Sequence, residues 1–347
     1  MASSLTFARS TFAKLSPHPF LLANLQPSDP EVPSSRTNGR APHQARPPNI
    51  NTSSLSHAHG SAVVRTGDTT VICGVRGEIL PVANIPQYRP RSKLDLSTPQ
   101  DVKRESLREL KDYDLLVPNI ELATGCAPQF LPGVPPTTLA QTLSTRVYSL
   151  LHSSRMIDTD HLRIWYTPPK IQEGDDERMQ EVEQEEYDEE ETQPELKAYW
   201  TLYIDVLFIS FDGNPLDAAW AAIVAALRDT KLPQARWDPD REMVVCSSSE
   251  KKALTVAGLP VSSTAAVFTE KEHVKTADGK YWILLDPDRL EESLCRETVS
   301  LIVDRSDGET RIRSISKSGG TIIGPELMKQ LGSLAEQRWE DFKNALA

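Results

Sequence analysis

The chain has 347 residues, enough for one large domain or two smaller ones, and a formal net charge of −11. Its 39% hydrophobic and 25% charged residues fit an ordinary globular protein, and no apolar run approaches the roughly 20 residues of a membrane span. The four cysteines lie far apart without a CxxC pair. This spacing argues against a structural zinc site or a disulfide framework and suits a reducing compartment.

The first 27 residues carry Arg9 and Lys14, no acidic residue and several serines, a composition that superficially suits a transit peptide. They lack the compact apolar region of a secretory signal, which makes a signal of that kind still less suitable. We expect residues 1–26 to contain an amphipathic helix that docks on the body through Leu5, Phe12 and Leu15. Residues 27–48 hold six prolines. Because proline removes backbone donors and disfavours helix in its predecessor, we predict an extended connector there.

The first half of the body alternates between strand and helix patterns. Residues 61–65 and 69–75 flank a short turn and predict a β-hairpin. Residues 81–99 indicate a loop. Further elements are predicted as a charged helix at 101–113, a strand at 117–122, a helix at 137–156 and a strand at 162–166.

The negative charge is concentrated in residues 171–195, which hold 13 acidic side chains and one basic one. Outside this segment 36 acidic and 37 basic side chains remain, so the net charge does not exclude RNA as a partner. The segment has too little apolar surface to offset the entropy of ordering, and we predict a disordered insertion between two strands. A solvated insertion, repulsion of RNA from the outer surface, and binding of a partner's basic tail all remain open.

The second half begins with residues 199–211, an apolar run that predicts a central strand. Asn214 is placed to cap the following helix, and Pro215 suits its first position. The helix over residues 216–227 is alanine-rich and apolar nearly all round, which indicates burial. Strands follow at 242–246, 265–269, 282–285, 298–303 and 311–316, and a final helix at 325–346 places Leu327, Leu331, Leu334 and Phe342 near one side. This irregular alternation favours an α+β fold.

Four segments of the sequence resemble the RNase PH family. They are the hairpin GSAVVRTGDTTVICGV at residues 60–75, LAQTLSTRVYSLL at 139–151, YIDV with FDGNPLDA at 203–218, and the tail from LDP at 285 to KSGG at 320. The resemblance covers residues 5–346 apart from the acidic insertion. It implies an RNase PH-like fold (ribosomal protein S5 domain 2-like), with mixed sheets packed against helices, over residues 49–347.

Within the family, the Asp-Gly-Asn-x-x-Asp-Ala pattern at residues 212–218 is similar to the non-catalytic branch of eukaryotic exosome ring subunits. Residues 118–122 and 124–128 resemble the exosome component eight type, with sister subunits of the branch left open. The resemblance implies a six-membered ring with other RNase PH-like subunits beneath S1/KH cap subunits. RNA would thread its central channel toward an associated exosome nuclease. It also implies that the protein is located in the nucleus and nucleolus, and in the cytoplasm as well.

Phosphorolysis requires cations, hydroxyls and free N–H groups that hold phosphate beside an RNA phosphodiester. The resemblance places an arginine and a hydroxyl residue just after the Asp-Gly pair, where this chain has Asn214, Pro215, Leu216 and Asp217. Leucine supplies no charge, proline lacks a donor, and at ~4 Å and a dielectric near 20 Asp217 would repel phosphate by about 4 kcal/mol. We therefore predict no catalytic residue and no enzyme activity. Asp212 and Asp205 are interpreted as turn and strand-end acids.

Four basic residues are candidates for sequence-independent contacts with RNA phosphates: Arg89, Arg91 and Lys93 in the loop, and Arg146 on a helix. Arg146 matches a helix arginine in the family pattern, although the expected companion about four residues on is Leu150. The alternative for each of them is a solvated surface charge.

No cofactor or metal site is indicated, because the P-loop, Rossmann and Gly-x-Ser-x-Gly patterns are absent. His57 and His59 are placed to alternate on one strand face, without a third ligand. Cys73 and Cys246 lie in apolar strands and are interpreted as small core residues. Two other functions stay open: a phosphorolytic 3′–5′ exoribonuclease with another arrangement, and a stand-alone RNA-binding protein.

Overall fold

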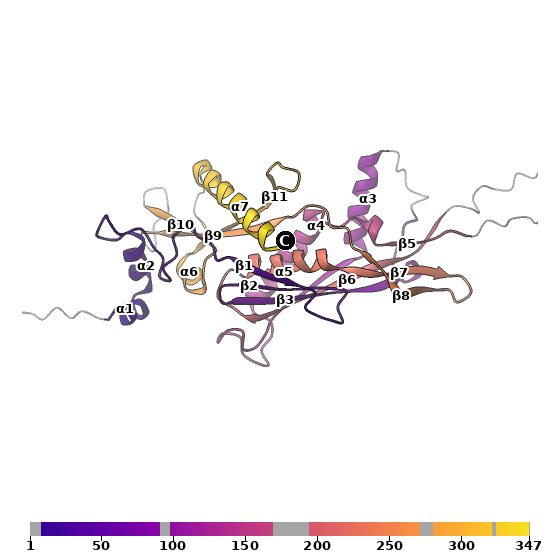
Figure 1. Ribbon diagram of the computed structural model, residues 1–347, viewed down its shortest axis with the longest axis horizontal. Coiled ribbons are helices and arrows are strands. Elements are labelled where there is room, and N and C mark those ends of the chain that lie inside the picture. The colour runs from indigo at the N-terminus through magenta and orange to yellow at the C-terminus, as the bar shows by residue number, and fades with distance from the viewer. Residues whose placement is uncertain (1–7, 91–97, 169–193, 271–279, 321–323, 347) are drawn as a thin grey trace, which may run out of the picture.

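The computed structural model describes residues 8–90, 98–168, 194–270, 280–320 and 324–346. Its elements in chain order are α1 (Arg9–Leu15), α2 (Pro17–Leu25), β1 (Pro48–Thr52), β2 (Gly60–Thr66), β3 (Thr69–Pro81), η1 (Val82–Asn84), α3 (Pro99–Asp112), β4 (Leu116–Leu122), α4 (Thr138–Ser154), η3 (Thr159–His161), β5 (Arg163–Tyr166), β6 (Glu195–Ser210), α5 (Pro215–Asp229), β7 (Lys231–Asp238), β8 (Met243–Ala253), β9 (Val261–Thr269), β10 (Tyr281–Leu285), α6 (Arg289–Leu294), β11 (Glu297–Asp304), β12 (Arg311–Ser318) and α7 (Pro325–Leu346). The fold is elongated, with α1 and α2 at one end and the β7–β8 hairpin at the other (Figure 1). The predicted α+β class with mixed sheets is confirmed.

The first sheet has the strand order β1-β2-β3-β6-β4, and β5 also pairs with β6. β4 runs parallel to β6, whereas β3 and β5 are antiparallel to it. β6 lies between β3 and β4, so the predicted central strand is confirmed. The predicted hairpin is confirmed as β2 and β3, whose buried Val64 and Val71 lie opposite each other.

Helix α5 lies between the first sheet and the second, where it packs on β2, β3 and β9. Twelve of its 15 residues are buried, which confirms the predicted buried helix. Its alanines permit close approach to β2, where a Cβ on Gly60 would lie 2.6 Å from the carbonyl oxygen of Ala226. The indole of Trp220 donates to the carbonyl of Pro260 at 2.9 Å, so this buried N–H is paired.

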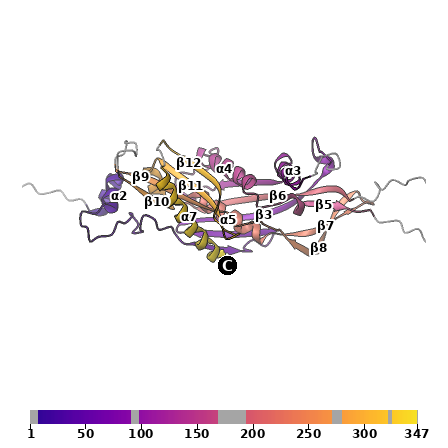
Figure 2. The ribbon, with the colours of Figure 1, turned by 90° about the horizontal axis from the view of Figure 1, so that it is seen from above.

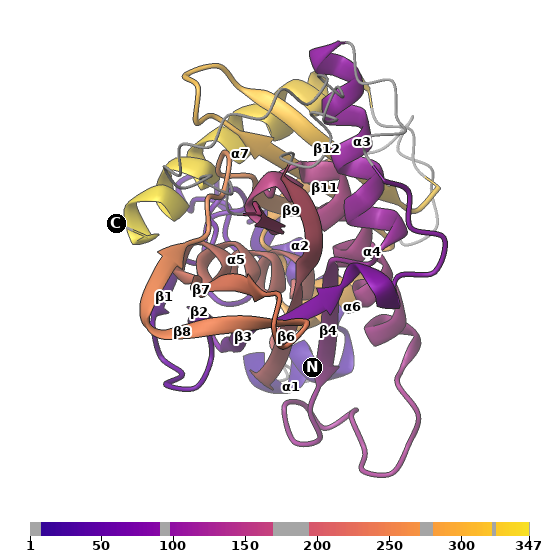
Figure 3. The same cartoon turned by 90° about the vertical axis from the view of Figure 1, so that its right-hand side faces the viewer.

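The second sheet has the order β10-β9-β11-β12, with antiparallel neighbours throughout. Helix α7 packs on β9 and β11 (Figure 2), and it buries Leu327, Leu331 and Phe342 as predicted, while Leu334 is only partly buried. Helix α4 contacts β4 of the first sheet and β12 of the second, beside α3 (Figure 3). The two sheets therefore share α4 and α5 in one core.

The N-terminal segment forms two helices, because Pro17 begins a second helix directly after α1. Docking through Phe12 and Leu15 was wrongly predicted, because Leu15 is 65% exposed and Phe12 is 36% exposed; Leu5 lies outside the described residues. Leu21 and Leu25 of α2 instead join a separate small core under β9 and β10, with Ala266, Phe268, Leu284 and Cys295.

The elements that were not predicted include β7 and α6. Pro233 interrupts the strand pattern of β7, and the pairing with β8 shifts register beside it. Helix α6 has only six residues and is held by a capping box between Asp288 and Glu291. Of the predicted acidic insertion, residues 171–193 lie outside the described residues, and β5 and β6 on either side of it pair with each other.

Candidate functional site: the corner between β6 and α5

The connection from β6 to α5, residues 211–214, turns sharply through two residues in the left-handed region. Gly213 has φ +76° and Asn214 has φ +50°. A Cβ on Gly213 would lie 2.5 Å from the backbone carbon of Asp288, so both the conformation and the packing on α6 require glycine. This β6–α5 corner is therefore held against the start of α6.

Arg46, from the Pro-rich connector, fills the corner. Its Nε and Nη2 each donate at 2.8 Å to one carboxylate oxygen of Asp286, and its Nη1 donates at 2.8 Å to the carbonyl of Asp212. The side chains are 9% and 3% exposed. Burial raises the pKa of Asp286, but hydrogen bonds and charge from Arg46 outweigh it and hold that pKa well below its usual range. Asp286 is therefore a buried, ionised partner of Arg46.

Two more connector arginines fix the same region. Arg36 is fully buried and forms an ion pair with Glu291, which is fully buried as well. Its Nη1 donates to the carbonyl of Leu285 at 2.7 Å. Arg40 contacts Asp286 at 3.4 Å, and burial lowers its pKa. The connector is thus anchored by charge to the segment that precedes α6.

Asn214 joins the two acids of the corner. Its Nδ2 donates at 2.8 Å to Asp217 and at 2.8 Å to Asp286. Asn214 and Pro215 occupy the predicted N-cap and first helical positions of α5, but the side chain of Asn214 makes no hydrogen bond to the helix backbone. The Nδ2 of Asn214 donates to carboxylates instead, and its Oδ1 accepts no hydrogen bond within the described residues.

Asp217 is buried rather than open to an incoming phosphate, so the expected direct repulsion needs correction. Besides Asn214, its carboxylate accepts hydrogen bonds from Ser262 at 2.6 Å and from both the backbone N–H and the hydroxyl of Thr264 at 2.8 Å. These donors stabilise the charge and join α5 to β9. Asp217 thereby serves the packing of the core.

Glu292 occupies the place at which an anion would approach the helix. One of its carboxylate oxygens accepts the backbone N–H of Asn214 at 2.7 Å, while Pro215 has no N–H and Leu216 is buried. Burial raises the pKa of Glu292 to about 7, against the opposing hydrogen bond from Asn214. A carboxylate of the chain itself therefore takes the donor that an oxyanion would use. We call Arg46, Asn214, Asp217, Asp286 and Glu292 the corner network.

The two remaining carboxylates of the region, those of Asp212 and Asp205, each contact a side chain of the chain itself. Asp212 lies in the turn as predicted, and its carboxylate is 3.2 Å from Arg46. Asp205 was predicted at a strand end, but it lies inside β6 and accepts a hydrogen bond from Asn119 of β4 at 3.1 Å. Neither of them faces a free cation among the contacts of the described residues.

The structure describes two of the four predicted RNA contacts, Arg89 and Arg146, and the two have different partners. Arg91 and Lys93 lie outside the described residues. Arg89 is exposed after η1, and its backbone N–H donates to the hydroxyl of Tyr113 at 3.4 Å. Arg146 of α4 donates to Ser300 at 3.0 Å, and burial lowers its pKa. Ser300 shares a hydrogen bond with Thr264, so Arg146 is linked to the corner network rather than to Arg89.

Three predictions about histidine and cysteine can be compared with the structure. His57 and His59 lie in the loop before β2, not on a strand face, and the Nδ1 of His59 accepts the N–H of Gly77 at 2.9 Å. Cys73 is a buried core residue as predicted. Cys246 was wrongly placed in the core, because β8 pairs only with β7 in the described part of the chain and leaves it exposed.

Sequence reasoning missed Arg46, Asp286 and Glu292. Arg46 and Asp286 are 240 residues apart, and no local pattern announces a contact over that distance. Pairing of conserved charges in related sequences is the signal that would have found it.

In the part of the chain that the structure describes, no helix is long and apolar enough to cross a membrane. The same residues contain no group of three or more His, Cys, Asp or Glu side chains that could hold a metal ion.

Comparisons with known proteins extend over nearly the whole chain. Residues 44–233 match the 3′ exoribonuclease family, domain 1 (RNase PH). Exosome complex component rrp43 of Schizosaccharomyces pombe is 30% identical over 96% of this chain and 97% of its own length. Exosome complex component Rrp42 of Methanothermobacter thermautotrophicus is 28% identical over 87% of this chain and 86% of its own length. A structure of the Archaeoglobus fulgidus exosome with RNA bound to the active site superposes with a TM-score of 0.62 at 24% identity, covering 95% of this chain and 97% of that one.

Proposed function

Because this chain belongs to the RNase PH family of 3′ exoribonucleases, we propose that it is a non-catalytic ring subunit of a eukaryotic RNA exosome. In that role it forms part of the channel through which RNA reaches a nuclease bound elsewhere. The similarity to exosome components runs through both sheets and is not limited to one motif. The whole chain is therefore proposed to act as the ring subunit.

The observation that carries the non-catalytic part is the corner network. Arg46 is bound by Asp286 and Asp212, and the N–H of Asn214 is bound by Glu292. An incoming phosphate dianion would have to displace one of these carboxylates, and breaking a buried charge pair costs about 3–5 kcal/mol. A corner of this kind stabilises the fold, and in the described part of the chain its Arg46 guanidinium and the N–H of Asn214 are already bound by carboxylates.

RNA contacts in this proposal are few and independent of base sequence. Arg89, Arg91, Lys93 and Arg146 are the proposed residues, each acting on RNA phosphates in the channel. Arg89 fits this role best among the described ones, since it is exposed and its guanidinium has no carboxylate partner among the described residues. Each such contact adds a salt-sensitive increment to affinity.

The proposed partners are the other RNase PH-like ring subunits, S1/KH cap subunits, RNA and an associated nuclease. The proposed cellular localisation is the nucleus and nucleolus, together with the cytoplasm. We propose residues 1–26 as a docked N-terminal unit, 27–48 as a connector and 49–347 as the RNase PH-like domain with an acidic insertion near 171–195. The narrower assignment to the exosome component eight type stays a prediction.

Reconstitution of the chain with its ring neighbours tests the proposal. The ring is supplied with phosphate and a labelled oligoribonucleotide, and released nucleoside diphosphates are measured for the wild type and for Asp212→Ala. We expect the same release from both rings, because any activity then belongs to another subunit. Release that disappears with Asp212→Ala would make the chain a phosphorolytic enzyme. Failure to enter a ring, judged by cross-linking and size, would favour a stand-alone RNA-binding protein.

A further inference from the structure

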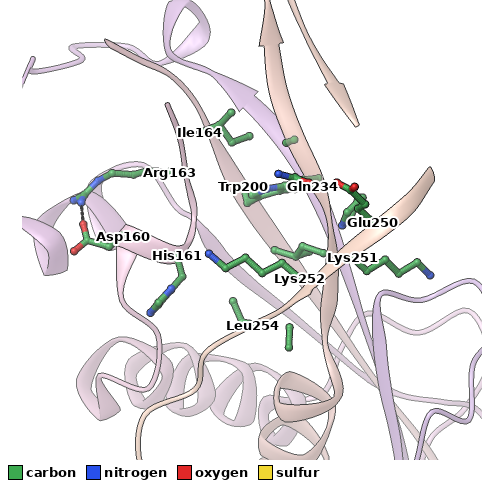
Figure 4. A pocket seen from close by; sticks show the side chains of 14 residues that line it. Asp160, His161, Arg163, Ile164, Trp200, Gln234, Glu250, Lys251, Lys252 and Leu254 are labelled. Carbon is green, nitrogen blue, oxygen red and sulfur yellow. Dashed lines mark hydrogen bonds and ion pairs between the residues drawn. The ribbon is translucent and has the colours of Figure 1, made fainter. Parts of the chain in front are cut away.

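A groove lies between β5 with the preceding η3 turn and the β7–β8 hairpin, at the end of the molecule away from α1 and α2 (Figure 4). Its cavity volume is about 400 Å³. The floor is apolar and consists of the buried side chains of Ile164, Trp200, Leu232 and Leu254. The rim is basic, with His161, Lys251 and Lys252 all exposed. We call these seven residues the lysine groove.

The acidic side chains beside the groove lie close to arginines, whereas its two lysines have no carboxylate partner among the described residues. Glu250 lies 4.0 Å from Arg236, and Asp160 forms an ion pair with Arg163. Within the described residues, no carboxylate lies within 4.0 Å of the amino group of Lys251 or Lys252. Figure 4 shows Lys252 reaching toward His161 across the groove and Lys251 pointing the other way. The rim thus offers positive charge on both sides of an apolar floor.

The chain supplies its own complementary charge next to this groove. Ile164 and Trp200 belong to β5 and β6, the two strands between which residues 169–193 are inserted. These 25 residues carry 12 acidic side chains and two basic ones. Pro168 follows Ile164 by four residues, which is roughly 13 Å of extended chain. A segment of this length tethered so near has an effective concentration on the order of millimolar at the groove.

We propose that the lysine groove binds the chain's own acidic segment, residues 173–191. Carboxylates of the segment pair with Lys251 and Lys252 beside the His161 ring, and its few apolar side chains, such as Val182 and Tyr187, complement the apolar floor. The two amino groups are compact, solvated charges, so the contact is electrostatic and sensitive to salt. The inference stands independently of the ring-subunit proposal, because it uses no residue of the corner.

The first test uses the full chain without substitutions. A zero-length carbodiimide reagent joins amino groups to carboxylates in contact, and peptide mass spectrometry locates the links. We expect Lys251 and Lys252 to be the lysines most linked to residues 173–191, with the yield falling as salt rises from 50 to 500 mM. Links spread evenly over exposed lysines such as Lys317 and Lys329 would overturn the proposal.

The second test separates the segment from the groove. A full-length variant with the acids of residues 173–191 replaced by Ser and Gln is titrated into a labelled synthetic peptide of residues 171–193, and anisotropy is recorded at low salt. We expect it to bind the peptide at least about tenfold more tightly than the wild type does, because the tethered segment competes in the wild type. Equal affinity of the two proteins for the peptide would contradict the proposal.

Charge reversal in the same neutral-segment background identifies the surface. Lys251→Glu with Lys252→Glu should weaken peptide binding at least about tenfold, whereas Lys317→Glu with Lys329→Glu makes the same change in net charge and should leave it within about twofold. Equal effects of the two pairs would overturn the proposal. A labelled oligouridylate run in parallel tests RNA as the occupant. Binding of RNA but not of peptide, lost with Lys251→Glu and Lys252→Glu, would also overturn it.

Discussion

Charged residues are buried and paired in the corner network, whereas the lysines of the lysine groove are exposed. At the corner, Arg46 is nearly buried and bound by carboxylates from distant parts of the chain, whereas Lys251 and Lys252 of the groove are exposed. The buried charges stabilise one arrangement of the fold, because separating them leaves an uncompensated charge. The exposed lysines contribute little to folding and remain available to an incoming anion. Burial and partners, more than the number of basic residues, therefore decide which region can bind an anionic ligand.

The largest expected effect comes from breaking the corner pair. Asp286→Ala removes the partner of Arg46 and a hydrogen-bond acceptor of Asn214, and it should lower the free energy of unfolding by about 3–5 kcal/mol. Chemical denaturation of the full chain measures this. Asp307→Ala, which removes an exposed carboxylate 2.8 Å from Arg311, is the control and should change it by less than about 0.5 kcal/mol. Similar losses for both variants would remove the distinction between buried and exposed charge.

A second substitution tests the backbone of the corner. Gly213→Ala places a Cβ where φ is +76° and where the backbone of Asp288 lies 2.5 Å away. We expect a loss of about 2–3 kcal/mol in unfolding free energy, since the strain and the displacement of α6 both act. Gly308→Ala, at φ +85° with open space around it, is the matched control for strain without a clash and should cost less. An equal cost at both sites would show that packing on α6 does not constrain the corner.

The pH dependence of stability tests Glu292. Its pKa rises from about 4.5 to about 7 in the fold, so its contribution to stability is fully present below about 4.5 and is lost as pH rises to about 7. Glu292→Gln keeps an oxygen that can accept the N–H of Asn214 but cannot ionise. Relative to the wild type, this variant should therefore gain roughly 3 kcal/mol in unfolding free energy between pH 4.5 and pH 7.5. Parallel profiles for the two proteins would mean that burial does not shift the pKa of Glu292.

The smallest expected effect belongs to the groove. Lys251→Ala with Lys252→Ala should change the free energy of unfolding by less than about 0.5 kcal/mol, since neither lysine has a carboxylate partner among the described residues. Thermal and chemical unfolding of the full chain at 150 mM salt measure it. A loss above 2 kcal/mol would show that these lysines belong to the folded core and would place the groove in the same class as the corner.

Sequence patterns predicted the elements whose residues pack locally or alternate regularly. The β2–β3 hairpin, the apolar β6 and the alanine-rich α5 follow from periodicity and turn residues within a few positions. β7 was missed because Pro233 interrupts its strand pattern, and the pairing with β8 shifts register beside this proline. Cys246 was misplaced because an apolar strand does not reveal whether a second layer covers it.

The corner was predicted in part. The sequence identified the loss of phosphate-binding residue types at Pro215 and Leu216, but it treated Asp217 as an open charge. The structure shows Asp217 buried among donors, and Glu292 at the N–H of Asn214. Such contacts join residues that are 45 to 78 positions apart, so only the folded chain brings them together.

A crystal of the full chain grown or soaked with sulfate tests the central claim directly, because sulfate has the shape and charge of phosphate. The account predicts that Arg46 keeps both hydrogen bonds to Asp286, that Glu292 keeps the N–H of Asn214, and that density at the corner contains no anion. An ordered sulfate coordinated there by Arg46 or by the N–H of Asn214, with either carboxylate displaced, would contradict it.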